Sequence, residues 1–257
     1  PVTSEVQKIA EPIGNSEVLI TFGSESMPGF PVKMEFRKSG KAFEQFSWYD
    51  RLYDNEKREQ FWLREDKDAA ARIVSAGDVC TVVRCESRYL MPDGKGADSQ
   101  PAAVYDWYIF KDSPLVYVSG VVRQEKDFIW DELHFLELNY PDKAFTHYIG
   151  AEPLAQEEFS GSQKSMVYSS WGALTDGNNT IAVLGGKTTM HDGLGGFGNY
   201  LNATWEVFRS RDRRMGAWLW IGETTEPNVV LPAVLATIAS RAKVTVIYPE
   251  LEEKLKA

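Results

Sequence analysis

The chain has 257 residues, of which 43% are hydrophobic and 25% are charged, and its formal net charge at pH 7 is −9. This balance indicates a globular protein and excludes a disordered chain. The acidic charge argues against sequence-independent binding to nucleic acid and against docking on anionic lipid, because both need a cationic surface. We therefore expect neither a nucleic acid nor a membrane among the partners.

Most of the chain consists of short runs in which apolar and polar residues alternate, a period typical of β-strands. The runs are, in chain order, VLITF, VKMEF, AARIVSAG, VCTVVRCESRYL, VYDWYIF, LVYVSGVVR, FIWDELHFLEL, MVYSSWGALT, TIAVLG, NATWEVFR, RMGAWLWIG and KVTVIY. Turn sequences such as KDSP and TDGNN separate them. Many strands with few helices predict an all-β protein, a large antiparallel β-sandwich that forms a single domain over residues 1–257.

Aromatic residues make up 12% of the chain, including eight tryptophans. Aromatic rings suit β-sheets, and exposed rings can also stack on the apolar faces of sugars. In a sandwich most of these rings belong to the core. We name Trp107 in YDWYIF and Trp171 in SSWGALT as candidate ligand-stacking residues.

The densest polar cluster within an apolar stretch lies in FIWDELHFLEL, residues 128–138. In a regular strand Trp130, Glu132 and His134 project to one side, whereas Glu137 projects to the other. The imidazole titrates near neutrality, the carboxylate can fix its tautomer and the indole can stack on a sugar. The alternative is a half-buried strand whose histidine and glutamate bond to neighbouring backbone or arginine groups.

The chain has three histidines, His134, His147 and His191. His147 and His191 stand beside predicted loops with aromatic or acidic neighbours, so we name both, together with Glu132 and His134, as candidate catalytic residues. The sequence contains neither H-E-x-x-H nor a paired C-x-x-C pattern. We therefore predict no metal site and no cofactor.

The segment HDGLGGFGNYLNATW, residues 191–205, contains the spacing G-x-G-x-x-G. A dinucleotide loop of this kind needs a strand before it and a helix after it. The following NYLNATWEVFR predicts a strand instead, so the glycines favour a sharp bend or a close approach of backbone to a ligand. We expect this loop to border the same concavity as Glu132 and His134, with Asp192 and Asn199 binding ligand.

Two segments near the C-terminus predict helices. Residues 232–242, PAVLATIASRA, begin with a proline suited to a first helical turn and are too short to span a bilayer. Residues 249–257, PELEEKLKA, carry acidic residues early and lysines late, as the helix dipole favours. This tail indicates a linker helix, so the chain could be the N-terminal part of a longer protein.

The succession of REDKDAAARIVSAGDVCTVVRCESRY, YDWYIFKDSPLVYVSGVV, FIWDELHFLEL and SSWGALTDGNNTIAVLGG resembles the galactose-mutarotase-like supersandwich. This domain forms aldose epimerases and is a module of many glycoside hydrolases and polysaccharide lyases. The resemblance implies an extended concave sheet that faces saccharide, and in the epimerases a histidine and a glutamate perform acid–base chemistry at the anomeric centre. The epimerases' Asn-His stretch is not found here, so Glu132 and His134 are nominated from the residues alone.

Three hypotheses follow, led by a carbohydrate-associated supersandwich domain that gives sugar binding or structural support in a glycan-degrading protein. Its partners would be a mono- or oligosaccharide and a following catalytic domain, and its location periplasmic or extracellular. The second hypothesis is a stand-alone enzyme of epimerase or lyase type that uses His/Glu acid–base catalysis. The third is a non-catalytic assembly or surface protein whose aromatic residues all lie in the core.

Overall fold

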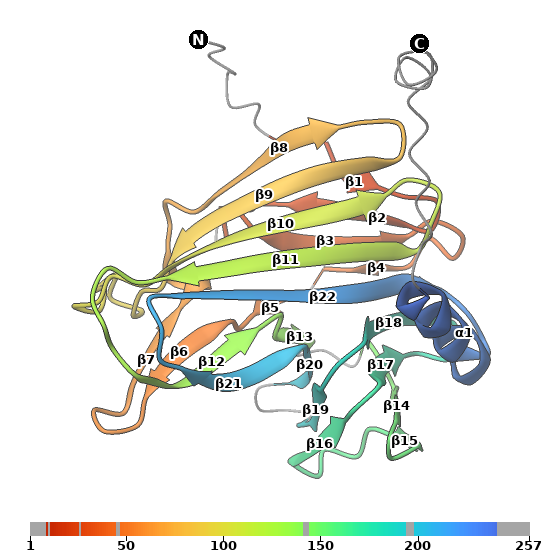
Figure 1. The fold of residues 1–257 in the computed structure, drawn as a ribbon. Coiled ribbons are helices and arrows are strands. Elements are labelled where there is room, and N and C mark those ends of the chain that lie inside the picture. Colours follow the sequence, from red (N-terminus) through yellow and green to blue (C-terminus); the bar gives the residue numbers. More distant parts are fainter. Residues whose placement is uncertain are drawn as a thin grey trace, which may run out of the picture.

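The computed structural model describes residues 9, 11–25, 27–44, 47–140, 144–193 and 198–240. Within these residues every pairing between the named strands is antiparallel, and the strands form four sheets. The prediction of an all-β sandwich is confirmed (Figure 1).

One sheet of nine strands, sheet A, runs the length of the molecule and curves from top to lower right in Figure 1. Three of its strands, of nine residues each, alternate buried and more exposed residues without interruption, as expected for a sheet with one face on the core. In spatial order its strands are β15 (Ala155–Glu158), β14 (His147–Ala151), β17 (Trp171–Thr175), β18 (Asn179–Leu184), β22 (Asp212–Glu223), β11 (Leu115–Arg123), β10 (Ala102–Phe110), β9 (Cys80–Arg88) and β8 (Ala70–Ala76).

Three shorter sheets pack against the inner face of sheet A. Sheet B contains β1 (Ile13–Gly14), β2 (Val18–Phe22), β3 (Pro31–Phe36) and β4 (Ala42–Phe43). Sheet C contains β16 (Lys164–Tyr168), β19 (Thr188–Asp192), β20 (Asn199–Asn202), β13 (Leu138–Tyr140) and β5 (Ser47–Trp48). Sheet D contains β21 (Thr204–Phe208), β12 (Trp130–Phe135), β6 (Arg51–Asp54) and β7 (Glu59–Trp62), which leads into a short 3-10 helix (Leu63–Glu65).

Sheets C and D are two halves of one interrupted layer. The chain passes directly from β5 into β6, from β12 into β13 and from β20 into β21, with only one or two residues between the members of each pair. Each pair therefore behaves as one strand with a local break, and the three breaks lie next to one another. This irregular line across the layer is where the candidate site is found.

The core lies between sheet A and the other sheets and is rich in aromatic rings. Tyr105 on β10 packs edge-on against Phe135 on β12, with ring centroids 5.2 Å apart. Trp107, two residues further along β10, packs against Phe22 of sheet B at 5.9 Å. Burying each such ring contributes on the order of 1.5–3 kcal/mol. The inward face of β10 thus packs sheet A against both sheet B and sheet D.

The helix α1 (Pro227–Ala239) begins five residues before the predicted start, because Pro227 rather than Pro232 occupies its first turn. It covers part of the outer face of sheet A, where its Leu231 joins a small apolar cluster with Trp171 and Trp220. No helix among the described residues is long and apolar enough to cross a membrane. The second predicted helix, residues 249–257, lies outside the described residues.

Candidate functional site

A buried carboxylate holds the break between β12 and β13. Asp50 Oδ2 accepts hydrogen bonds from the backbone N–H of Leu136 at 2.9 Å and from the hydroxyl of Tyr105 at 2.7 Å. Asp50 Oδ1 accepts the N–H of Glu137 at 2.6 Å. Leu136 has a φ of +56°, a left-handed conformation that a leucine rarely adopts without outside support. Asp50 supplies that support, and the strand alternation changes at this point.

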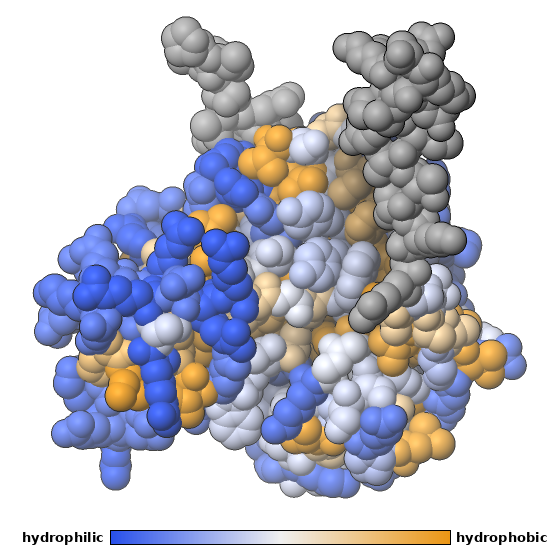
Figure 2. Space-filling model, in the orientation of Figure 1, coloured by the Kyte–Doolittle hydropathy of each residue, from blue (hydrophilic) through white to orange (hydrophobic). Residues whose placement is uncertain are grey.

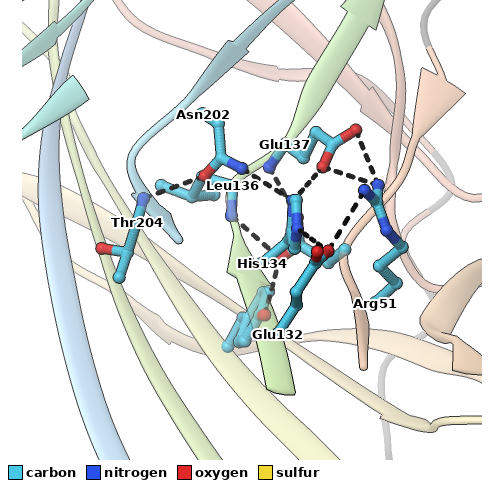
Figure 3. Close-up of polar contacts among 9 residues, drawn as sticks. Arg51, Glu132, His134, Leu136, Glu137, Asn202 and Thr204 are labelled. Carbon is cyan, nitrogen blue, oxygen red and sulfur yellow. Dashed lines mark hydrogen bonds and ion pairs between the residues drawn. The ribbon is translucent and has the colours of Figure 1, made fainter. Parts of the chain in front are cut away.

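The break brings Glu137 to the same side as Glu132 and His134. His134 Nε2 lies 3.0 Å from Glu132 Oε2, and His134 Nδ1 bonds to Glu137 Oε2 on its other side (Figure 3). Arg51 on β6 donates to both oxygens of Glu137, at 3.0 and 3.2 Å, and lies 3.7 Å from Glu132. The imidazole is thus held between two carboxylates that share one guanidinium.

An asparagine completes the surroundings of the imidazole. Asn202 Oδ1 accepts the backbone N–H of Thr204 at 2.9 Å, which turns Asn202 Nδ2 toward His134 Nδ1, 2.9 Å away (Figure 3). Glu132 therefore contacts one ring nitrogen of His134, and Glu137 and Asn202 contact the other. Its ring orientation is fixed by the fold.

The pKa values describe an ionised pair. Burial opposes a charge on His134, but the hydrogen bonds to Glu132 and Glu137 outweigh it and raise the pKa of His134. The hydrogen bond from His134 lowers the pKa of Glu132 despite partial burial. The cluster therefore favours the protonated form of His134 more than water does, and Glu132 is a weaker base than an ordinary glutamate.

Solvent reaches only part of this cluster. The side chains of Glu132 and Arg51 are 22% and 23% exposed, whereas those of His134 and Glu137 are 4% and 3% exposed. Trp205 on β21 pairs directly with His134 across the sheet, is 53% exposed, and places its ring centroid 5.7 Å from the imidazole. Arg51, Glu132 and Trp205 can touch a ligand, and His134 and Glu137 hold them in place.

His191 lies on the neighbouring part of the same layer. Its ring stacks on Tyr200 with centroids 4.9 Å apart and planes at 13°, and its Nδ1 lies 2.9 Å from Ser165 Oγ. Burial lowers the pKa of His191, and the negative charges of Asp192 and Glu137 oppose that shift. Burial likewise raises the pKa of Tyr200, with Glu137 adding to the effect. The field of Glu137 therefore reaches both rings.

The two other polar candidates of the glycine segment are occupied within the fold. Asp192 is buried, and although burial opposes it, hydrogen bonds from the backbone and hydroxyls of residues 160–162 lower its pKa to about 2. Asn199 is also buried, and its Oδ1 accepts the N–H of Gly193 at 3.3 Å. Strand β20 follows the segment where a dinucleotide loop needs a helix, while residues 194–197 lie outside the described residues.

Three predicted stacking residues lie in the core rather than on an exposed surface. Trp107, Trp130 and Trp171 are 0%, 1% and 2% exposed. For Trp130 the reason is a β-bulge between Trp130 and Leu133, which turns the indole to the inner face of the sheet. Trp107 faces inward from β10, and Trp171 lies beneath α1.

His147 lies apart from this cluster. It is on β14 of sheet A, where it pairs with Thr175 and Glu158, and Thr146 Oγ1 lies 2.8 Å from its Nδ1. No sequence pattern indicated the residues that build the site around His134, which are Asp50, Arg51, Glu137, Asn202 and Trp205. Among the residues that the structure describes, no group of three or more His, Cys, Asp or Glu side chains is arranged to hold a metal ion.

No protein-family model and no curated protein matches the sequence. Solved structures do share its fold. The α-N-acetylgalactosaminidase NagBb from Bifidobacterium bifidum, in its GalNAc complex, matches 88% of this chain at 12% identity and a TM-score of 0.59. An α-mannosidase from Enterococcus faecalis V583 matches 94% of it at 10% identity and a TM-score of 0.58. A TPR-domain containing protein from Parabacteroides distasonis ATCC 8503 matches 91% of it at 10% identity and 0.51.

This chain spans only part of those proteins, 38% of NagBb, 33% of the mannosidase and 49% of the TPR-domain protein. At such low identity the likeness shows the fold alone. The chain shares the β-sandwich fold of these three solved structures.

Proposed function

We propose that this chain is a carbohydrate-binding supersandwich domain of a glycan-processing protein, and that sugar binds at Arg51, Glu132 and Trp205. The observation that carries the proposal is the exposed indole of Trp205, 53% accessible and 5.7 Å from the His134 ring, beside two partly exposed charged groups. Support for the ligand class comes from two proteins that share the fold, the α-N-acetylgalactosaminidase NagBb and the α-mannosidase, which act on sugars.

The three side chains offer complementary contacts to one sugar ring. The indole of Trp205 can pack against the apolar C–H face of a pyranose, as aromatic rings in ligand sites do. The Glu132 carboxylate accepts hydrogen bonds from sugar hydroxyls, and the Arg51 guanidinium donates to ring or hydroxyl oxygens. Their partners His134 and Glu137 are buried and bonded to them, so the contacts are pre-organised before a sugar arrives.

The same electrostatics favour binding over acid–base catalysis. A general base works best with a pKa near the working pH, whereas the hydrogen bond from His134 lowers the pKa of Glu132. His134 is also almost fully buried, so its nitrogens are engaged by protein groups rather than by a substrate. The stand-alone epimerase or lyase hypothesis is therefore the weaker one.

The wider setting belongs to the same proposal. We place the domain in the periplasm or outside the cell, next to a catalytic domain of the same polypeptide. The support for a neighbouring catalytic domain is that NagBb and the mannosidase are longer chains, of which this chain matches 38% and 33%.

A glycan array followed by isothermal titration calorimetry tests the binding site. Trp205→Ala should raise the dissociation constant at least tenfold for whichever glycan binds, because an exposed aromatic anchor is lost. The matched control is Leu154→Ala, which removes an exposed apolar side chain from the turn between β14 and β15, away from Trp205, and should leave binding unchanged. An array without any binder, or an equal affinity in the Trp205 variant, contradicts the proposal.

A further inference from the structure

A cavity of about 320 Å³ lies on the opposite face of sheet D from Arg51 and Glu132. It opens where the β6–β7 hairpin, the loop at residues 95–99 and the start of β12 meet. This volume is at the lower end of small-molecule sites and accommodates a single ring. In Figure 2 the corner of the molecule that carries the hairpin is mostly hydrophilic, with a small hydrophobic group among the polar residues.

The floor of this cavity is aromatic. Trp130 is turned to this face by the bulge in β12 and packs against Phe61 at 5.4 Å and Phe128 at 4.6 Å. The indole N–H is already used, since Trp130 Nε1 donates to Gln124 Oε1 at 3.0 Å. Phe128 is only half-buried. The rings thus present an apolar surface whose one indole donor is satisfied elsewhere.

A buried hydroxyl in the cavity wall lacks a hydrogen-bond partner. Ser99 is 4% exposed and lines the cavity, and its Oγ finds no hydrogen-bond partner among the described residues. Buried hydroxyls are normally bonded, and one left unpaired destabilises a protein by about 1–3 kcal/mol. The backbone oxygen of Ser99 accepts the N–H of Glu125 at 2.8 Å, so the residue is held in place. Because Ser99 Oγ is itself buried, a ligand hydroxyl reaches it only when the side chain turns toward the cavity, and it can then both donate to and accept from this oxygen.

The rim carries charges of both signs. Lys57 and Lys95 face three carboxylates, those of Asp54, Glu59 and Asp98. Asp54 Oδ1 is occupied by the backbone N–H groups of Glu56 and Lys57, at 3.0 and 3.2 Å, and Lys57 Nζ lies 3.9 Å from Asp54 Oδ2. Such a rim of mixed charge offers many hydrogen-bond donors and acceptors. It fits a neutral ligand rich in hydroxyl groups.

We infer that this cavity is a second ligand site and that it takes one neutral monosaccharide unit, stacked on Phe128 and bonded to Ser99 Oγ. The ligand class follows from the cavity's own chemistry: a half-buried ring, an unpaired buried hydroxyl and a mixed-charge rim. This site is separate from the one proposed at Arg51, Glu132 and Trp205. Because sheet D lies between the two sites, each can be tested independently of the other.

The test uses the whole chain and a panel of neutral methyl glycosides, with galacturonate and glucosamine as charged comparators. Binding is followed by NMR shifts of backbone amides. Neutral glycosides should shift the amides of Gly96, Ala97 and Ser99, and the two charged sugars should bind more weakly. No shift at these amides with any sugar overturns the inference, since the hydroxyl then serves a bound water only.

Two variants separate a binding role from a structural one. Ser99→Ala should raise the dissociation constant about tenfold, the effect of one lost hydrogen bond, and should leave the melting temperature unchanged or higher because an unpaired hydroxyl is removed. Phe128→Ala should weaken binding by a similar factor. The control is Ile129→Ala, an exposed neighbour that does not line the cavity. A lower melting temperature for Ser99→Ala with unchanged affinity assigns the hydroxyl to the fold and refutes the site.

Trp205→Ala distinguishes this inference from the proposed function. It should abolish shifts at the amides of Thr204 and Trp205 while leaving those at Ala97 and Ser99 intact. Loss of both sets of shifts in this variant contradicts an independent second site. Shifts at Ala97 and Ser99 without any at Trp205 in the unmodified chain support the second site and reject the first.

Discussion

Sheet A and the layer formed by sheets C and D differ in regularity, and the polar chemistry lies in the irregular one. In sheet A, β9, β10 and β11 each run for nine residues with uninterrupted alternation, and the inward rings of β10 are fixed in the core. The opposite layer is broken into strands of two to six residues by Asp50, by Leu136 and by a bulge in β12. A regular strand can show one face to water and one to the core. A broken strand can gather Glu132, His134 and Glu137 on one side.

The largest expected effect is in the regular sheet. Trp107→Ala removes a fully buried indole from β10 and should lower the free energy of unfolding by about 3–5 kcal/mol, because a cavity remains where the ring was. Urea denaturation measures this. Val79→Ala, an exposed site at the end of the same sheet, is the control and should change stability by less than about 0.5 kcal/mol. A small effect at Trp107 would mean that sheet A is less tightly packed than its alternation indicates.

The next effect is at the break itself. Asp50→Ala removes the acceptor of two backbone N–H groups and of the Tyr105 hydroxyl, and should lower the free energy of unfolding by about 2–4 kcal/mol. It should also weaken any ligand bound at Glu132, because Glu137 loses its anchor. Calorimetric melting and glycan titration of the same sample measure both. An unchanged melting temperature would show that the break needs no carboxylate.

The pH dependence of stability offers a sharper test of Asp50. Complete burial is the dominant cause that raises its pKa from 3.8 to about 7, while its hydrogen bonds partly oppose the shift. Since the folded pKa lies above the unfolded one, protonation of Asp50 contributes stability that is fully present below about pH 4 and is lost as pH rises through 7. In Asp50→Asn this contribution disappears, so the stability difference between the two proteins should vary between pH 4 and 7. A constant difference over that range would contradict the raised pKa.

The sequence predicted the regular regions and missed the irregular ones for a physical reason. Alternation in β10 follows from local sequence, so the sheet and its fold class could be derived without coordinates. The bulge that turns Trp130 inward and the φ of Leu136 depend on partners far along the chain, such as Asp50, which lies 86 residues from Leu136. No local pattern records such a contact. Glu132 and His134 were found because they are two residues apart on one strand, whereas Arg51 and Asn202 come from other strands.

Substitution of His134 should lower the free energy of unfolding by less than substitution of Asp50 and by more than substitution of Trp205. Its pH dependence should be opposite to that of a buried neutral imidazole. His134→Gln replaces an imidazolium held by two carboxylates and should lower the free energy of unfolding by about 1–3 kcal/mol at pH 6. Because the pKa of His134 is raised in the folded state, its contribution is fully present below the unfolded pKa of 6.5 and is lost as pH rises through the folded pKa. The loss in His134→Gln should therefore shrink at alkaline pH. Urea denaturation at pH 6 and pH 9 measures it, and an equal loss at both would indicate a neutral ring.

The smallest effect on stability is expected where the effect on binding is largest. Trp205→Ala truncates a side chain that is 53% exposed on an edge strand and should change the free energy of unfolding by less than about 0.5 kcal/mol. Its adjacent exposed residue on the same face, Val207, provides the comparison, because Val207→Ala removes apolar area from β21 without touching His134. If both variants are stable and only Trp205→Ala loses glycan affinity, the indole serves a ligand. If Trp205→Ala unfolds the layer, the indole shields His134 from solvent. The polar cluster of the irregular layer then stabilises the fold rather than binding a ligand.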